Sequence, residues 1–291
     1  MDSKLYFALV AMPGIVEVLF NQFIGEAMFR IRQNPVVVLA LIANLCIVGC
    51  ASSNRTATDS RVSASVEPVT PRLFMTPSPV FDMICQQTPF KIDPAVQIEY
   101  QKELYEKLDT FQSEWDKAAI SIVPESETVA GRKFTRKEYS VALALCTWIP
   151  MGDPVFIVTP GGYLGKPRKR NGFDLPLSMT AFVSMTHHEL LHSLVENFVV
   201  ALLFGDAKVS PMYERYKYSP KPEKQNVLIH LHLMALQKAV YQQLGNKALL
   251  DATNTLYEFI GNDYKRAWEI VDTEGTEPFL AELQSFNSKS K

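Results

Sequence analysis

The feature that most constrains this chain is the pattern H-E-x-x-H between His188 and His192. Residues four apart lie on one face of an α-helix, so the two imidazoles can bind one zinc ion. Glu189 stands beside them, where a carboxylate can accept a proton from a zinc-bound water instead of ligating the metal. Residues 179–204 form a long, largely apolar run that Gly205 ends, which predicts a half-buried helix. The stretch therefore predicts a zinc site on a helix.

The distribution of histidine supports the same interpretation. All five histidines lie in two places, namely His187, His188 and His192 in the first and His230 and His232 in the second. Histidines that merely fill a core would be scattered along the chain. A helix whose histidines are only packed or hydrogen-bonded remains the alternative.

The composition indicates a globular protein and excludes one large class of function. The 291 residues are 47% hydrophobic and carry a formal net charge of −2. Nucleic-acid-binding proteins carry a marked basic excess, which is missing here. The segments before residue 73 do not resemble globular sequence, so residues 73–291 are predicted to form a single domain of ordinary size.

The N-terminal region is predicted to be a targeting segment. Residues 28–49 begin with Arg30 and Arg32 and continue into an apolar run of the length found in signal peptides. Residues 1–27 are apolar but lack a cationic leader. Met28 is therefore a candidate for the true start, with residues 1–27 as a mis-assigned upstream extension.

The signal segment ends in Ile47-Val48-Gly49-Cys50, which resembles the lipobox of bacterial lipoproteins. The resemblance implies that the Cys50 thiol is acylated and becomes the mature N-terminus, which places the protein at the cell envelope, facing the periplasm or the exterior. An uncleaved signal anchor is the alternative. Residues 50–72 are rich in Ser, Thr, Ala, Val and Pro, and predict a flexible tether.

Two further cysteines, Cys85 and Cys146, lie in the predicted domain. In an oxidising compartment they can pair as a disulfide. Two buried thiols are an equal alternative, because sequence does not show whether their Cα atoms approach each other.

The segment before the motif predicts one helix followed by two strands. Asp93 followed by proline is a typical helix start, and apolar residues then recur at helical spacing until Pro124 ends the pattern. Residues 139–145 alternate between apolar and smaller side chains, and residues 155–158 form a second apolar run. We expect an antiparallel pair of strands, then a loop over residues 161–175.

The segment after the motif is predicted to be mainly helical. We expect a loop over residues 209–222, a helix over 222–245, two helical stretches at 248–260 and 264–271, and a polar tail. The predicted fold class is thus α+β and mainly helical.

A strand pair, an H-E-x-x-H helix and a following helix with further ligand types resemble the zincin metallopeptidases over residues 134–245. In that family the two histidines ligate Zn²⁺, the glutamate is the general base, and a peptide or protein substrate binds along a strand beside the motif helix. The resemblance implies these roles for His188, His192 and Glu189. It also implies a single domain whose small antiparallel sheet packs against the motif helix and the helix that follows.

The third zinc ligand is less constrained by the sequence. The metzincin extension would need glycine and histidine three and six residues after His192, where this chain has valine and phenylalanine. A gluzincin would use a downstream glutamate, for which Glu223 and Glu214 are candidates. His230, in the middle of an apolar helical run, is the first choice, and His232 projects about 200 degrees away from it around the helix.

Two functions follow from these patterns. The leading one is a zinc-dependent hydrolase, a peptidase anchored to the membrane by a lipidated cysteine. The alternative is a non-catalytic envelope lipoprotein with a structural metal site or a partner-binding role. Three protein ligands plus an open coordination position indicate catalysis, whereas four protein ligands indicate a structural site.

Overall fold

The structure is a computed structural model that describes residues 71–86, 93–145, 156–170, 172–204 and 210–289. These residues belong to a compact unit, Val66–Lys291. The predicted signal segment and Cys50 lie outside the described residues. So does the predicted disulfide, because Cys146 and the side chain of Cys85 are not described.

The described part of the chain is mainly helical with a small amount of strand, as the sequence predicts. In chain order the elements are β1 (Arg72–Pro77), α5 (Pro79–Gln86), α6 (Pro94–Ala130), β2 (Glu138–Leu143), β3 (Phe156–Val158), a short 3₁₀ turn (Pro160–Gly162), β4 (Arg168–Arg170), β5 (Phe173–Leu175), α7 (Met179–Phe204), α8 (Pro211–Lys217), α9 (Gln225–Gln243), α10 (Lys247–Ile260), α11 (Asn262–Glu274) and α12 (Glu277–Lys289).

The main sheet has the order β1-β2-β3 and is parallel throughout, so the predicted antiparallel pair is wrong. In β2 the side chains of Tyr139, Val141 and Leu143 are buried, whereas Glu138 and Ser140 are exposed. Such one-sided alternation is typical of antiparallel sheets, which is why it misleads. Helices α5 and α6 connect β1 to β2, in keeping with the long crossover that parallel strands require. Strand β1 falls where the sequence suggests the end of a tether.

Helix α6 begins as predicted and ends later than predicted. The side chain of Asp93 caps its first turn, accepting from backbone N–H groups. The helix continues through Pro124 to Ala130 and stops at Gly131, whose φ of 64° is left-handed. Proline removes the N–H that would bond to the carbonyl of residue 120. Because Ile120 is 77% exposed, that carbonyl lies on the solvent side, where water can replace the missing partner.

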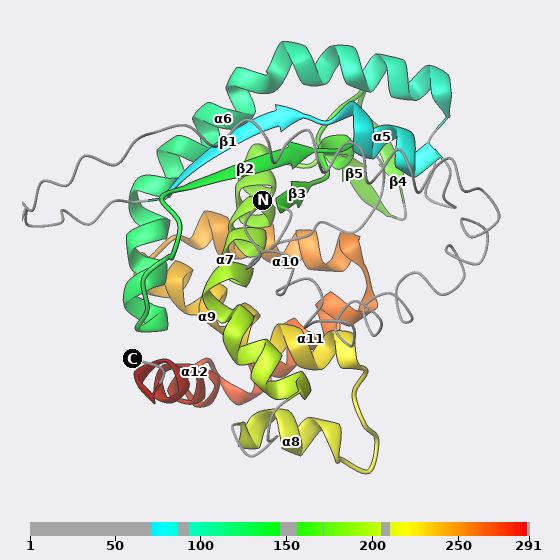
Figure 1. Cartoon of the computed structure of the whole chain (residues 1–291). Helices are drawn as coiled ribbons and strands as arrows, with labels where there is room; N and C mark the ends of the chain where they lie inside the picture. The colour runs from blue at the N-terminus through cyan, green and yellow to red at the C-terminus, as the bar shows by residue number, and fades with distance from the viewer. Residues whose placement is uncertain (1–70, 87–92, 146–155, 171, 205–209, 290–291) are drawn as a thin grey trace, which may run out of the picture. The chain divides into compact units, whose positions relative to one another are not determined.

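Helix α7 spans the predicted residues and lies at the centre of the packing. It contacts α6, α9, α10 and β3 (Figure 1). Its side chains are buried almost continuously from Ala181 to Val195, in keeping with a sequence that is apolar on nearly all sides. Among the helices that the structure describes, none is long and apolar enough to cross a membrane.

Three segments predicted as irregular contain regular structure. Strands β4 and β5 form an antiparallel pair inside the predicted 161–175 loop. Helix α8 lies inside the predicted 209–222 loop, with Ser210 as its N-cap. The polar tail forms α12, because Phe279 and Leu283 bury an apolar stripe that the surrounding polar residues obscure in the sequence.

The path of α6 through Pro124 predicts that Pro124→Ala stabilises the protein. The proline ring is exposed, so its loss sacrifices little packing, while alanine restores a helical N–H. We expect the free energy of unfolding to rise by roughly 1–3 kcal/mol, measured by urea denaturation. Ser121→Ala, at an exposed site in the same helix, is the control and should change it by about 0.5 kcal/mol or less. Equal or lower stability of Pro124→Ala would show that α6 does not continue through this residue.

Candidate metal centre

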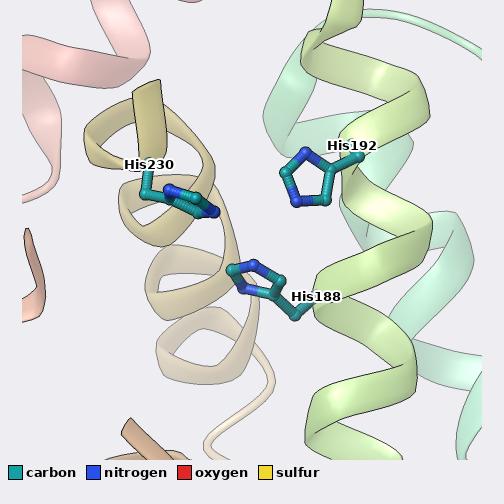
Figure 2. Close-up of side chains that lie close together, drawn as sticks. All are labelled: His188, His192 and His230. Atoms are coloured by element: carbon teal, nitrogen blue, oxygen red, sulfur yellow. The ribbon is translucent and has the colours of Figure 1, made fainter. Parts of the chain in front are cut away.

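Three histidines from two helices converge in the interior. His188 and His192 project from one face of α7, four residues apart, and His230 faces them from α9 (Figure 2). One ring nitrogen of each lies within 4.8 Å of those of the other two. In the described part of the chain this group of three could hold a metal ion, and it contains the two motif histidines together with the first choice for a third ligand.

Two histidines of the cluster are buried and the third is partly exposed. His188 is fully buried and His230 is 5% exposed, whereas the side chain of His192 keeps 27% of its surface exposed. The ring of Tyr264 from α11 lies 4.7 Å from that of His230, centroid to centroid. The aromatic rings and the apolar interior thus leave His192 as the ligand nearest to solvent.

Hydrogen bonds determine which nitrogen of His188 carries the proton. The Nδ1 atom lies 2.7 Å from the hydroxyl of Tyr257. That hydroxyl donates its single hydrogen to Oε1 of Gln237, so it can only accept from His188. The proton of His188 is therefore on Nδ1 and the lone pair on Nε2. This Nε2 is buried and has no hydrogen-bond partner in the structure.

His230 has the same tautomer for a simpler reason. Its Nδ1 lies 2.6 Å from the carbonyl oxygen of Asn226, one turn earlier in α9. A carbonyl oxygen only accepts, so Nδ1 donates and the lone pair is on Nε2. An acceptor buried without a partner, such as Nε2 of His188, costs free energy that a cation at this position would offset. Three neutral imidazoles are a donor set that suits first-row transition metals, zinc among them. The residues therefore fit a metal ion.

Glu189 places a carboxyl group beside the cluster. The residue is 2% exposed, and neither carboxyl oxygen has a hydrogen-bond partner in the structure. Its Oε2 lies 3.8 Å from Nε2 of His192. Burial raises the pKa of Glu189 well above its usual value. The motif glutamate thus lies next to the ligand that is nearest to solvent.

The same burial keeps the imidazoles neutral. It lowers the pKa of His188 well below the usual value, and His192 and His230 lower it further. Burial, followed by His230, also lowers the pKa of His192. Neutral imidazole is the form that binds metal, so burial of these side chains favours the ligating state.

The two glutamates considered as third ligands lie elsewhere. Glu223 precedes α9 instead of lying in its first turn, and it pairs with Arg266 of α11 at 2.7 Å. Glu214 lies in the first turn of the short helix α8. The group that could hold a metal contains neither of them among the described residues.

The remaining histidines are held by other partners. His232 projects away from His230, and its Nε2 lies 2.8 Å from Oε2 of Glu282 in α12. His187 lies between Ser126 of α6 and Tyr241 of α9, with both contacts at 2.8 Å. Clustering of histidines in the sequence therefore includes two that have structural roles.

Two residues that support the site belong to no recognisable sequence motif. Tyr257 comes from α10 and Gln237 from α9, far in sequence from the H-E-x-x-H pattern. Gln237 did have a signal, because it interrupts an apolar helical run seven residues after His230 and so lies on the same helix face. Nothing in the sequence singles out Tyr257.

Comparison with protein-family models, with curated proteins and with solved structures finds no match to this chain. The chemistry of the site is therefore the basis for assigning a function.

Substituting each proposed ligand in turn should show which histidines bind the metal. We expect His188→Ala, His192→Ala and His230→Ala to lose about one bound metal per chain, because each removes one of three donor atoms. Metal content after loading and dialysis, measured by mass spectrometry, is the readout.

His232→Ala is the matched control, two residues from His230 on the same helix. It breaks the contact to Glu282 and should lower the thermal midpoint while the metal content stays at the parent's value. Full metal retention by His230→Ala would contradict its place in the cluster.

Proposed function

We propose that this protein is a zinc-dependent hydrolase, a peptidase held at the bacterial cell envelope by a lipid on Cys50. The observation that carries the proposal is the convergence of His188, His192 and His230 beside the unpaired, buried carboxyl group of Glu189. Protein interiors rarely leave buried polar groups without hydrogen-bond partners. A site that does so is a candidate for chemistry.

The residues divide the chemical work between them. A bound zinc ion supplies Lewis-acid polarisation of the scissile carbonyl and of the attacking water. The three imidazoles of His188, His192 and His230 would hold the ion. Glu189 accepts the proton of the water at a carboxyl oxygen and passes it to the leaving amine. Its raised pKa makes the ionised carboxylate a stronger base than that of an exposed glutamate.

Burial of the site supports a second candidate, a structural metal centre in a non-catalytic lipoprotein. His188 and Glu189 are almost fully buried, and a structural ion needs no route for substrate. The two candidates differ in what occupies the fourth coordination position. Hydrolytic activity of the zinc-loaded protein decides between them.

Glu189→Gln tests the proposed base. Glutamine preserves the shape of the side chain but cannot take up the proton, so zinc content should stay at the parent's value. Cleavage of an unbiased peptide library should fall by about a hundredfold to ten-thousandfold.

Glu214→Gln makes the same chemical change outside the cluster and should retain both zinc and activity. Undiminished cleavage by Glu189→Gln would refute the assigned base. A zinc-loaded parent that cleaves nothing would instead favour the structural metal centre.

The proposed anchor has a test of its own. Cys50→Ser removes the thiol that the lipobox resemblance assigns to acylation, so incorporation of labelled fatty acid should be abolished. Mass spectrometry of the parent should show a mature chain that begins at Cys50. A mature chain that still begins upstream of Cys50 would contradict the lipoprotein assignment.

A further inference from the structure

The amide of Gln237 connects two hydrogen-bond chains in the middle of the helical core. Gln237 is fully buried in α9. Its Nε2 donates to the backbone carbonyl of Ser184 at 2.9 Å and to the hydroxyl of Tyr241 at 3.1 Å. A flipped amide would direct its oxygen at the Ser184 carbonyl, where two acceptors would repel each other. The orientation of the amide is thereby determined, with Oε1 directed at Tyr257.

The first chain leads from the amide oxygen to the metal centre. Tyr257 donates to Oε1, and its oxygen accepts the Nδ1–H of His188. The amide oxygen itself lies 3.4 Å from the same Nδ1. Both acceptors near Nδ1 therefore favour a proton on that atom, which leaves Nε2 free to ligate.

The second chain leads from the amide nitrogen to the neighbouring histidine. Tyr241 accepts from Gln237, so its own hydrogen goes to Nδ1 of His187 at 2.8 Å. The Nε2–H of His187 then donates to Ser126, whose hydroxyl donates to the carbonyl of Ile122 at 2.6 Å. His187 thus carries its proton on Nε2. The two ends of one amide impose opposite tautomers on two adjacent histidines.

We propose that Gln237 is a positioning residue for the metal centre, which acts through Tyr257 to hold His188 in its ligating tautomer. The inference rests on the proposed metal binding and adds a residue that controls it. Without the acceptor on Gln237, the Tyr257 hydroxyl is free to turn and donate to Nδ1 of His188. The proton of His188 then moves to Nε2, and the nitrogen that should ligate the metal is blocked.

Two substitutions of Gln237 separate this role from simple packing. Gln237→Met keeps the length of the side chain but removes the amide acceptor. Gln237→Glu, neutral in this buried position, keeps a carbonyl oxygen for Tyr257 and an O–H donor for the opposite end. Both should lower the thermal midpoint of the metal-free protein, because both disturb the core. Only Gln237→Met should change the tautomer of His188.

Nitrogen-15 NMR of the metal-free proteins gives the tautomer directly, with the His188 signals assigned by their absence from His188→Ala. We expect a proton on Nδ1 in the parent and in Gln237→Glu, and on Nε2 in Gln237→Met. A proton on Nε2 in the metal-free parent, or one that stays on Nδ1 in Gln237→Met, would overturn the proposal. This measurement needs neither metal nor activity, so its failure is distinct from a failure of the proposed function.

Zinc affinity gives a second test of the proposal, in which the effects of two substitutions should not be additive. Gln237→Met should bind Zn²⁺ about tenfold to a hundredfold more weakly than the parent, because binding must reverse the Tyr257 hydrogen bond and leave its hydroxyl unpaired. Adding Tyr257→Phe removes the hydroxyl that, by donating to Nδ1 of His188, keeps the proton on Nε2. The double variant should therefore recover part of the zinc affinity. Competition with a chelating dye measures both. A double variant that binds zinc no better than Gln237→Met would refute control through the Tyr257 hydroxyl.

Discussion

A polar group buried among packed helices must have a hydrogen-bond partner. At the centre of this protein, the hydrogen bonds of the Gln237 amide link residues from four helices. Its two ends connect to residues of α7, α9 and α10, and through His187 to α6. The hydrogen bonds end at the backbone carbonyls of Ser184 and Ile122, which only accept. Losing one partner leaves a buried group unpaired, at a cost of roughly 1–3 kcal/mol. The mutual placement of α6, α7, α9 and α10 therefore follows from hydrogen-bond direction as well as from apolar packing.

Within this well-paired interior, the exceptions gather at the proposed metal centre. Five buried side-chain polar atoms lack a partner in the described residues, and three of them belong to His188 and Glu189. The other two are Oγ1 of Thr186 and Nδ1 of His232. A core selected for stability alone would pair such atoms or replace them with apolar groups. Their concentration beside His192 and His230 is what a cation-binding site requires before the cation is present.

Sequence reasoning succeeded where the signal is local and failed where it depends on tertiary contacts. The helix start at Asp93 and the whole of α7 follow from capping and apolar run length, and the pairing of His188 with His192 follows from helix periodicity. Strand direction does not follow from the sequence, because a parallel strand with one exposed face has the same alternation of buried and exposed residues as an antiparallel one. Helix α6 continues through Pro124 because that face meets water, which only the folded arrangement determines. Tyr257 reaches His188 across 69 positions of sequence, so no local pattern marks it.

The three histidines of the proposed metal centre are buried to unequal degrees. His188 and His230 are enclosed by α9, α10 and α11, with the rings of Tyr257 and Tyr264 against them. His192 alone of the three keeps a substantial exposed surface, and Oε2 of Glu189 lies 3.8 Å from its Nε2. The proposed base is thus next to the one proposed ligand that borders solvent. Tyr257 and Gln237, whose hydrogen bonds orient His188, are both buried, so their polar groups are protected from exchange with water.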